Sequence, residues 1–168
     1  MSGRLFAAGM TALLLLGFAR EASAQELLLG ASGSAAGGIQ GGGAGLGVLE
    51  RARSRLRLGI DARNSEEPKD IIGFGLLLEV ELRGTVGADV RYFRMVDPHF
   101  YVDIGAMGYL FPSSLLGATA GLEYRHSLGT KTSFLAGPEV NVFAFGSDLP
   151  GGTIIWQGLL QVGLHVDL

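Results

Sequence analysis

The stretch RARSRLRLGIDAR, residues 51–63, alternates between two kinds of side chain. Around Gly59, its odd positions hold Arg51, Arg53, Arg55, Arg57, Asp61 and Arg63, and its even positions hold Ala52, Ser54, Leu56, Leu58, Ile60 and Ala62. Successive side chains of a β-strand point to opposite faces, so the stretch predicts a strand with one charged and one uncharged face. An amphipathic helix over 48–58 is the alternative, because Leu49, Ala52 and Leu56 fit a helical stripe loosely.

The same alternation continues to the end of the chain. In the segments 71–82, 86–92, 100–110, 116–124, 134–144 and 154–168, no even position carries a charged residue. The odd positions carry the acidic and basic residues together with many glycines, among them Gly73, Gly75 and Gly121. The pattern predicts one face that is apolar throughout and another that is charged, polar or glycine.

Two features of this pattern favour a membrane barrel. A crowded lumen has a use for glycines, because they make room for arginine side chains, whereas glycines on a water-exposed face would only weaken strands. The segments are also about 10–14 residues long, which suits tilted membrane strands. The alternative is a soluble periplasmic lipocalin-like binder, in which the apolar face would point inward around an apolar ligand.

Eight strands are predicted, over residues 26–35, 46–63, 71–82, 86–94, 100–111, 115–126, 132–145 and 153–168. An even number of strands is typical of a closed bacterial barrel with both termini in the periplasm. When a barrel closes, its first and last strands pair, so that no strand edge leaves unpaired backbone amides in the hydrocarbon. The predicted fold is therefore all-β, a closed eight-stranded antiparallel up-and-down transmembrane β-barrel, with a glycine-rich loop over residues 36–45.

Turn positions give a first estimate of register. A turn over residues 64–70 places Arg55 opposite Glu79 and Arg53 opposite Glu81. A turn over residues 95–99 places Arg91 opposite Asp103. Opposite charges across a strand pair are favourable. Pro138 lies in the middle of a predicted strand and predicts a bulge there, because proline cannot donate to the ladder.

The N-terminal residues have the layout of a secretory signal peptide. An apolar run over residues 5–18 follows a basic start and leads to Ala22-Ser23-Ala24, a small-x-small cleavage site. Residues 1–24 are therefore predicted to be a signal peptide, and residues 25–168 the barrel. Without Arg4, Arg20 and Glu21, the 13 basic and 16 acidic residues become 11 and 15, a net charge of −4 that disfavours a nucleic-acid partner.

The charged odd positions form the candidate site, a lumen charge network. Its predicted members are Arg53, Arg55, Arg57, Glu79, Glu81, Asp89, Arg91, Asp103 and Glu123. An eight-stranded barrel is just wide enough for side chains to fill, so these groups are expected to form a salt-linked plug. A narrow ion path is the alternative.

No catalysis, cofactor or metal site is expected. The chain has no cysteine, and His99, His126 and His165 show no metal-ligand spacing. The alternative is a lipid A-modifying hydrolase that uses His126 and Ser127, with Glu123 or Glu139 orienting the histidine.

These features together resemble the small eight-stranded bacterial outer-membrane barrels, such as the OmpA membrane domain and OmpX. The resemblance covers residues 25–168 and is one of architecture: the export signal, the strand count, the parity, and a last strand with apolar residues at 160, 162, 164, 166 and 168. It implies a monomer in the outer membrane of a Gram-negative cell envelope, porin-like in architecture. The implied partners are outer-membrane lipid and the barrel-insertion machinery, and the implied role is structural or one of surface interaction.

Overall fold

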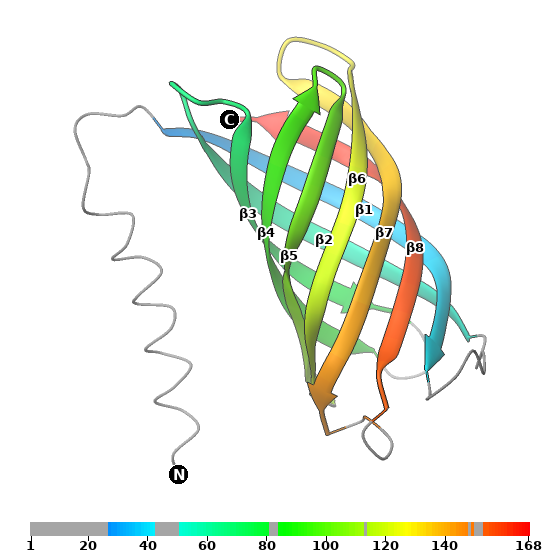
Figure 1. The fold of residues 1–168 in the computed structure, drawn as a ribbon. Coiled ribbons are helices and arrows are strands. Elements are labelled where there is room, and N and C mark those ends of the chain that lie inside the picture. The colour runs from blue at the N-terminus through cyan, green and yellow to red at the C-terminus, as the bar shows by residue number, and fades with distance from the viewer. Residues whose placement is uncertain (1–26, 43–50, 81–83, 113, 148, 150–152) are drawn as a thin grey trace, which may run out of the picture.

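A computed structural model describes residues 27–42, 51–80, 84–112, 114–147, 149 and 153–168. Eight strands make up the fold: β1 (Leu27–Gly42), β2 (Arg51–Asn64), β3 (Asp70–Glu79), β4 (Thr85–Asp97), β5 (Phe100–Phe111), β6 (Leu115–Ser127), β7 (Thr132–Gly146) and β8 (Ile155–Asp167). The strands tilt steeply around a narrow barrel (Figure 1).

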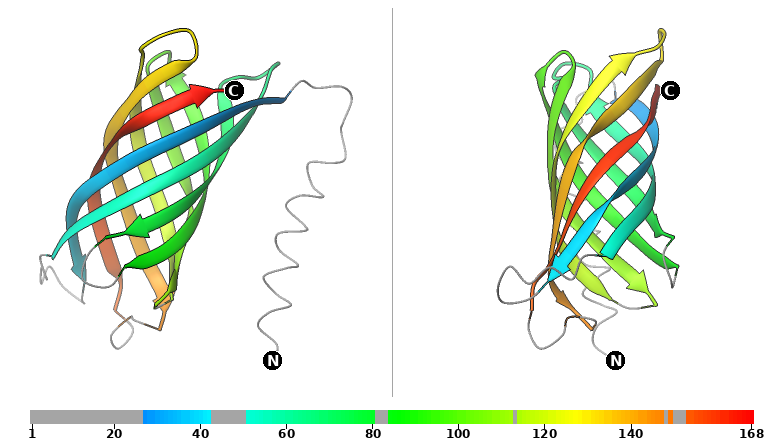
Figure 2. Two further views of the ribbon diagram at one scale, coloured as in Figure 1. Left: turned by 180° about the vertical axis from the view of Figure 1, so that it is seen from behind. Right: turned by 90° about the vertical axis from the view of Figure 1, so that its right-hand side faces the viewer.

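Each strand pairs antiparallel with the next, and β1 also pairs with β8, which closes the barrel. The predicted strand count, closure and up-and-down topology are confirmed. The C-terminus, the start of β1 and the hairpins β2–β3, β4–β5 and β6–β7 lie at one end, called here the terminal end (Figures 1 and 2). The other end is called the opposite end.

The two faces of the wall follow the predicted parity. Leu58 and Leu76 on the outer face are 63% and 64% exposed, whereas Arg55 on the inner face is 2% exposed. This orientation contradicts the lipocalin-like alternative, which requires the leucines inside. The helical alternative for residues 48–58 is wrong over its described part, because β2 begins at Arg51.

The first strand is longer than predicted. Residues 36–42, assigned to a glycine-rich loop from the sequence, continue β1: residues 36–40 pair with both β2 and β8, and residues 41–42 pair with β8. Clusters of glycine are read from a sequence as turns or loops. Here two neighbouring strands satisfy the backbone on both sides, and small residues let them approach closely.

The predicted register is correct for one hairpin and wrong for another. Arg55 lies opposite Glu79 and Leu56 opposite Leu78, as expected. Arg91, however, lies opposite Gly105, and Asp103 faces Phe93. The reason is that β4 runs on to Asp97 with an irregularity after Met95, so the turn is tighter than residues 95–99.

The bulge expected at Pro138 is absent. Gly121 pairs with Glu139 and Tyr124 with Ala136, so β6 and β7 keep one register on both sides of the proline. A proline removes a hydrogen-bond donor but does not insert a residue. The two strands therefore have the same number of residues over this stretch, and no bulge is needed. The register of this pair shifts instead between Leu116 and Gly117.

Candidate functional site

Arg91 lies in the middle of the lumen and holds three carboxylates. Its Nε is 2.8 Å from Asp89 Oδ2, and its Nη1 is 2.8 Å from Glu139 Oε2 and 3.4 Å from Asp103 Oδ1. Arg91 is 1% exposed. Charge-assisted hydrogen bonds of this kind are the strong ones, so Arg91 ties β4, β5 and β7 together across the barrel.

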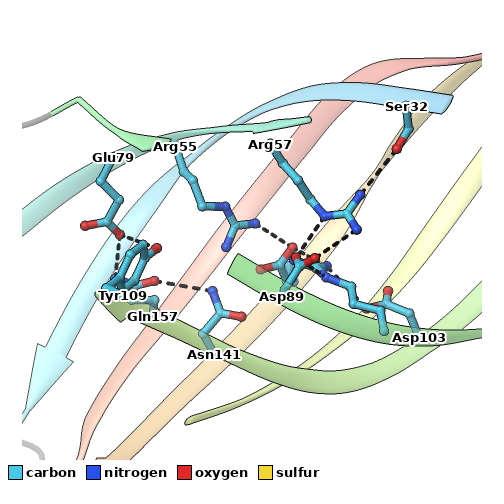
Figure 3. A network of polar contacts seen from close by, with 11 residues as sticks. Ser32, Arg55, Arg57, Glu79, Asp89, Asp103, Tyr109, Asn141 and Gln157 are labelled. Carbon is cyan, nitrogen blue, oxygen red and sulfur yellow. Dashed lines mark hydrogen bonds and ion pairs between the residues drawn. The ribbon is translucent and has the colours of Figure 1, made fainter. Parts of the chain in front are cut away.

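Two more arginines join this cluster from β2. Arg57 makes a two-point contact with Asp89, with Nε at 2.8 Å from Oδ2 and Nη2 at 3.0 Å from Oδ1. Arg55 Nη2 donates to Glu139 Oε2 at 2.7 Å (Figure 3). We call Arg55, Arg57, Asp89, Arg91, Asp103 and Glu139 the central ion cluster.

Gly75 makes the contact between Arg57 and Asp89 possible. It lies on β3, between the strands that carry the two side chains, and a methyl group on it would meet Asp89 Oδ1 and lie 2.6 Å from Arg57 Nε. The expectation that lumen glycines make room for arginines is confirmed at this position.

Glu79 has a separate group of partners towards the opposite end of the lumen. The Tyr109 hydroxyl donates to Glu79 Oε1 at 2.7 Å, and Gln157 Nε2 donates to the same oxygen at 3.0 Å (Figure 3). Arg53 Nη1 reaches Glu79 Oε2 at 3.4 Å. Arg55 faces Glu79 in the register but bonds to Glu139 instead, because a long side chain in a narrow barrel can cross the lumen.

The terminal end holds a third set of polar contacts. Arg125 Nε donates to Glu123 Oε1, and the Arg125 guanidinium lies 4.3 Å from the centre of the Tyr101 ring. His165 Nε2 lies 2.9 Å from Asp61 Oδ2, so these two side chains join β8 to β2 across the small residues of β1.

Apolar side chains also point into the lumen, at both ends. Leu77, Met107, Tyr109 and Phe143 form a buried cluster towards the opposite end. Ile71, Phe93 and Tyr101 form another towards the terminal end. The prediction of an inner face made only of charged, polar and glycine residues is therefore wrong, because apolar side chains from several strands also meet one another inside the lumen.

The predicted site residues separate into these groups. Arg55, Arg57, Asp89, Arg91 and Asp103 come together, Arg53 joins Glu79, Glu123 lies apart with Arg125, and Glu81 lies outside the described residues. Glu139, Arg125 and Asp61 were left out of the predicted network although they are buried in it. Their odd parity was the signal that could have identified them.

The candidate catalytic residues are not brought together. His126 is exposed, and its Nδ1 lies 3.5 Å from the Tyr124 hydroxyl, whereas Glu123 and Glu139 are buried in the lumen. Ser127 Oγ donates to the Gly129 carbonyl oxygen at 2.7 Å. Within the described part of the chain, no group of three His, Cys, Asp or Glu side chains is placed to hold a metal ion. No helix among the same residues has the length and hydropathy of a membrane span.

The comparisons with known proteins found a similar solved structure but no matching family. No protein-family model matches the sequence, and no curated protein matches it. The crystal structure of Neisserial surface protein A is similar, with a TM-score of 0.45 and 14% sequence identity over 84% of this chain and 97% of that chain. A likeness at this TM-score and identity carries no conclusion about the role of this chain.

Proposed function

We propose that the protein is an integral protein of the bacterial outer membrane, with a structural or surface-interaction role. In this proposal the barrel crosses the bilayer, its lumen is closed by its own side chains, and it catalyses no reaction. One observation carries the proposal: all eight strands present apolar side chains on the outside, while the charged side chains of the strand interiors are enclosed.

The outer surface fits hydrocarbon better than water. Ile60, Leu160 and Ile104 are 64%, 68% and 62% exposed, and comparable residues surround the whole barrel. Soluble monomers rarely present continuous apolar patches larger than a few hundred Å². Each exposed leucine would contribute roughly 1.5–3 kcal/mol if lipid covered it fully. The closed ladder also satisfies the strand backbone internally, which a bilayer requires.

The contents of the lumen support a closed barrel. The central ion cluster fills the middle, and apolar clusters lie towards both ends. An ion entering the barrel would have to displace buried side chains that already have charged partners. We therefore favour a plug over the ion path.

The remaining parts of the proposal concern export and partners. Residues 1–24 serve as the signal peptide, and the barrel-insertion machinery places the chain among outer-membrane lipids as a monomer. Both ends of the barrel sequence then face the periplasm, as in bacterial barrels with an even number of strands.

Substitution of Leu76 tests the lipid-facing surface. Leu76→Arg places a charge on the outer face near the middle of the wall, and it should destabilise the barrel in bilayers by about 2–4 kcal/mol. Leu76→Ile is the matched control and should behave like the parent. The measurement is urea unfolding in lipid vesicles, followed by the shift in gel mobility between unheated and boiled samples.

Two further observations would contradict the proposal. One is recovery of the exported protein in the soluble periplasmic fraction without detergent, together with a stable Leu76→Arg variant. The other is a steady single-channel conductance in planar bilayers, which would replace the plug with an ion path.

A further inference from the structure

Phenylalanines border β5 and β7 in the same way. Phe100 and Phe134 lie on the outer face near the terminal end, and Phe111 and Phe145 lie where the two strands reach the opposite end (Figure 1). In each strand the two phenylalanines are an odd number of positions apart. Side chains at an odd separation in a regular strand point to opposite faces, so regular alternation would turn Phe111 and Phe145 into the lumen.

Phe111 and Phe145 point outward instead. They are 68% and 69% exposed, whereas Tyr109 and Phe143, two positions earlier in their strands, are 1% and 0% exposed. The rings of Tyr109 and Phe143 contact each other in the lumen, with their centres 5.6 Å apart. The alternation is therefore reversed between these positions, and it is reversed in both strands.

One extra residue in β5 accounts for the first reversal. Val86 and Gly87 are consecutive on β4, but their partners on β5 are Phe111 and Tyr109, so Leu110 is an added residue. A β-bulge of this kind re-aims the side chains next to it. Phe111 then lies opposite Val86, on the exposed apolar face.

The same arrangement occurs in β7. Leu116 and Gly117 are consecutive on β6, but their partners on β7 are Phe145 and Phe143, so Ala144 is an added residue. Phe145 lies opposite Leu116, which is also exposed. Two strands therefore carry a bulge next to their last phenylalanine, and each bulge turns that phenylalanine out of the lumen.

The distance between the phenylalanines of one strand fits the apolar part of a bilayer. β5 has 12 residues from Phe100 to Phe111, one of which belongs to the bulge. About ten regular steps of about 3.3 Å, in a strand tilted by about 40°, rise roughly 25 Å along the barrel axis. The apolar band on the outside of outer-membrane barrels has about this height. Phe134 and Phe145 have the same separation on β7.

We propose that the two bulges place Phe111 and Phe145 among the lipid acyl chains of the leaflet at the opposite end, next to the headgroups. Phe100 and Phe134 then lie at the other boundary, and β5 and β7 cross the hydrocarbon from one phenylalanine to the other. The inference rests on the proposed function, because it requires the outer face of the wall to contact lipid.

Two observations identify acyl chains as the partner. Phe111 is continuous with the apolar outer face, since Ile104 on the same strand is exposed as well. Polar contacts begin just beyond Phe145, where the Ser147 N–H donates to the Ser114 carbonyl oxygen at 2.9 Å. A change from apolar to polar side chains at one level of a wall is typical of the boundary between hydrocarbon and headgroups.

The test places a single tryptophan at each position. The sequence has one tryptophan, so Trp156→Phe provides the background, and Phe111→Trp, Phe145→Trp and Ile104→Trp are made separately in it. Ile104→Trp is the matched control, because Ile104 is exposed on the outer face between the two phenylalanines of β5. Each protein is folded into vesicles of phosphatidylcholine brominated either near the glycerol end or near the middle of its acyl chains, and the loss of tryptophan fluorescence is measured.

The depth of quenching decides the inference. At positions 111 and 145, bromine near the glycerol end should quench more strongly than bromine near the middle of the chains, and the order should be reversed at position 104. Quenching at 111 and 145 by aqueous acrylamide and by neither lipid would overturn the inference. Quenching by none of the three would overturn it as well, because a second copy or another protein would then cover the phenylalanines.

Position 104 separates this inference from the proposed function. Quenching of Ile104→Trp by lipid, with none at positions 111 and 145, would leave the proposed function intact and remove only the inference. Absence of lipid quenching at position 104 would contradict the proposed function and the inference together. Stronger quenching by the deeper bromine at positions 111 and 145 would also contradict the inference, because the boundary would then lie beyond the two phenylalanines.

Discussion

The central ion cluster and the two apolar clusters use the same inward face of the same strands for opposite chemistry. On β3 and β4, Gly75 and Asp89 serve the central ion cluster, whereas Leu77 and Phe93 belong to the apolar clusters. The difference teaches that parity decides whether a side chain points inward. The side chains that the other strands bring to the same place in the lumen decide what it meets there.

The two regions depend on each other. Buried ion pairs are strong only when every charge has partners, because removing a charge from water is costly. The apolar clusters towards the ends keep bulk water away from the central ion cluster, which strengthens the attraction between its charges. In turn, the ion pairs hold opposite walls of the barrel together, so that the apolar side chains meet.

The largest effect is expected at the centre. Arg91→Leu removes the shared partner of Asp89, Asp103 and Glu139. Breaking a buried ion pair by removing one member costs about 3–5 kcal/mol, so the variant should unfold at much lower urea concentration or fail to close. Arg94→Ala is the control on the same strand. Arg94 is exposed and lies 3.7 Å from Asp70, and its loss should leave the urea midpoint unchanged.

A stable Arg91→Leu barrel would remove the distinction between the centre and the ends. It would mean that the three carboxylates find other partners, or that they are not enclosed.

The next effect is expected in the apolar cluster towards the opposite end. Leu77 is fully buried there. Leu77→Ala should cost about 3 kcal/mol, because it leaves a cavity as well as losing apolar burial. Leu76→Ala on the other face should change urea stability much less in detergent, because Leu76 is 64% exposed. Equal losses at the two positions would show that the lumen end is no better packed than the outer surface.

The smallest effect is expected at Tyr109, which contacts both an apolar cluster and a charged side chain. Tyr109 belongs to the apolar cluster through its ring and donates its hydroxyl to Glu79 at 2.7 Å. Tyr109→Phe keeps the ring and removes one hydrogen bond to a carboxylate, for a loss of about 2 kcal/mol. Tyr92→Phe removes an exposed bond to Asp70 and should have no measurable effect on the urea midpoint. If Tyr109→Phe lost as much stability as Leu77→Ala, the hydrogen bond to Glu79 would matter as much as the packing of the apolar cluster, and Glu79 would have to be counted with the central ion cluster.

Much of the wall could be predicted because strand parity is a local property. The alternation of residues 51–63 and its continuation determine which side chain faces out, and Leu58 and Arg55 lie on the faces expected. The register of β2 and β3 could be predicted from the turn over residues 64–70. The register of β4 and β5 could not be predicted from residues 95–99, because Asp97 belongs to β4 and the turn closes more tightly than expected. Likewise, glycines in β1 were taken for a loop because their pairing with β8 joins opposite ends of the chain.

The sequence by itself therefore determined the strand count, the closed antiparallel topology and the two chemically distinct faces of the wall. Only the tertiary structure decided which charges meet. Arg55 bonds to Glu139 rather than to Glu79, which lies opposite it in the register, and Arg91 gathers carboxylates from three strands. The reason is geometric: alternation acts between neighbouring residues, whereas contacts across a lumen depend on barrel tilt, the gaps left by glycines and the reach of long side chains.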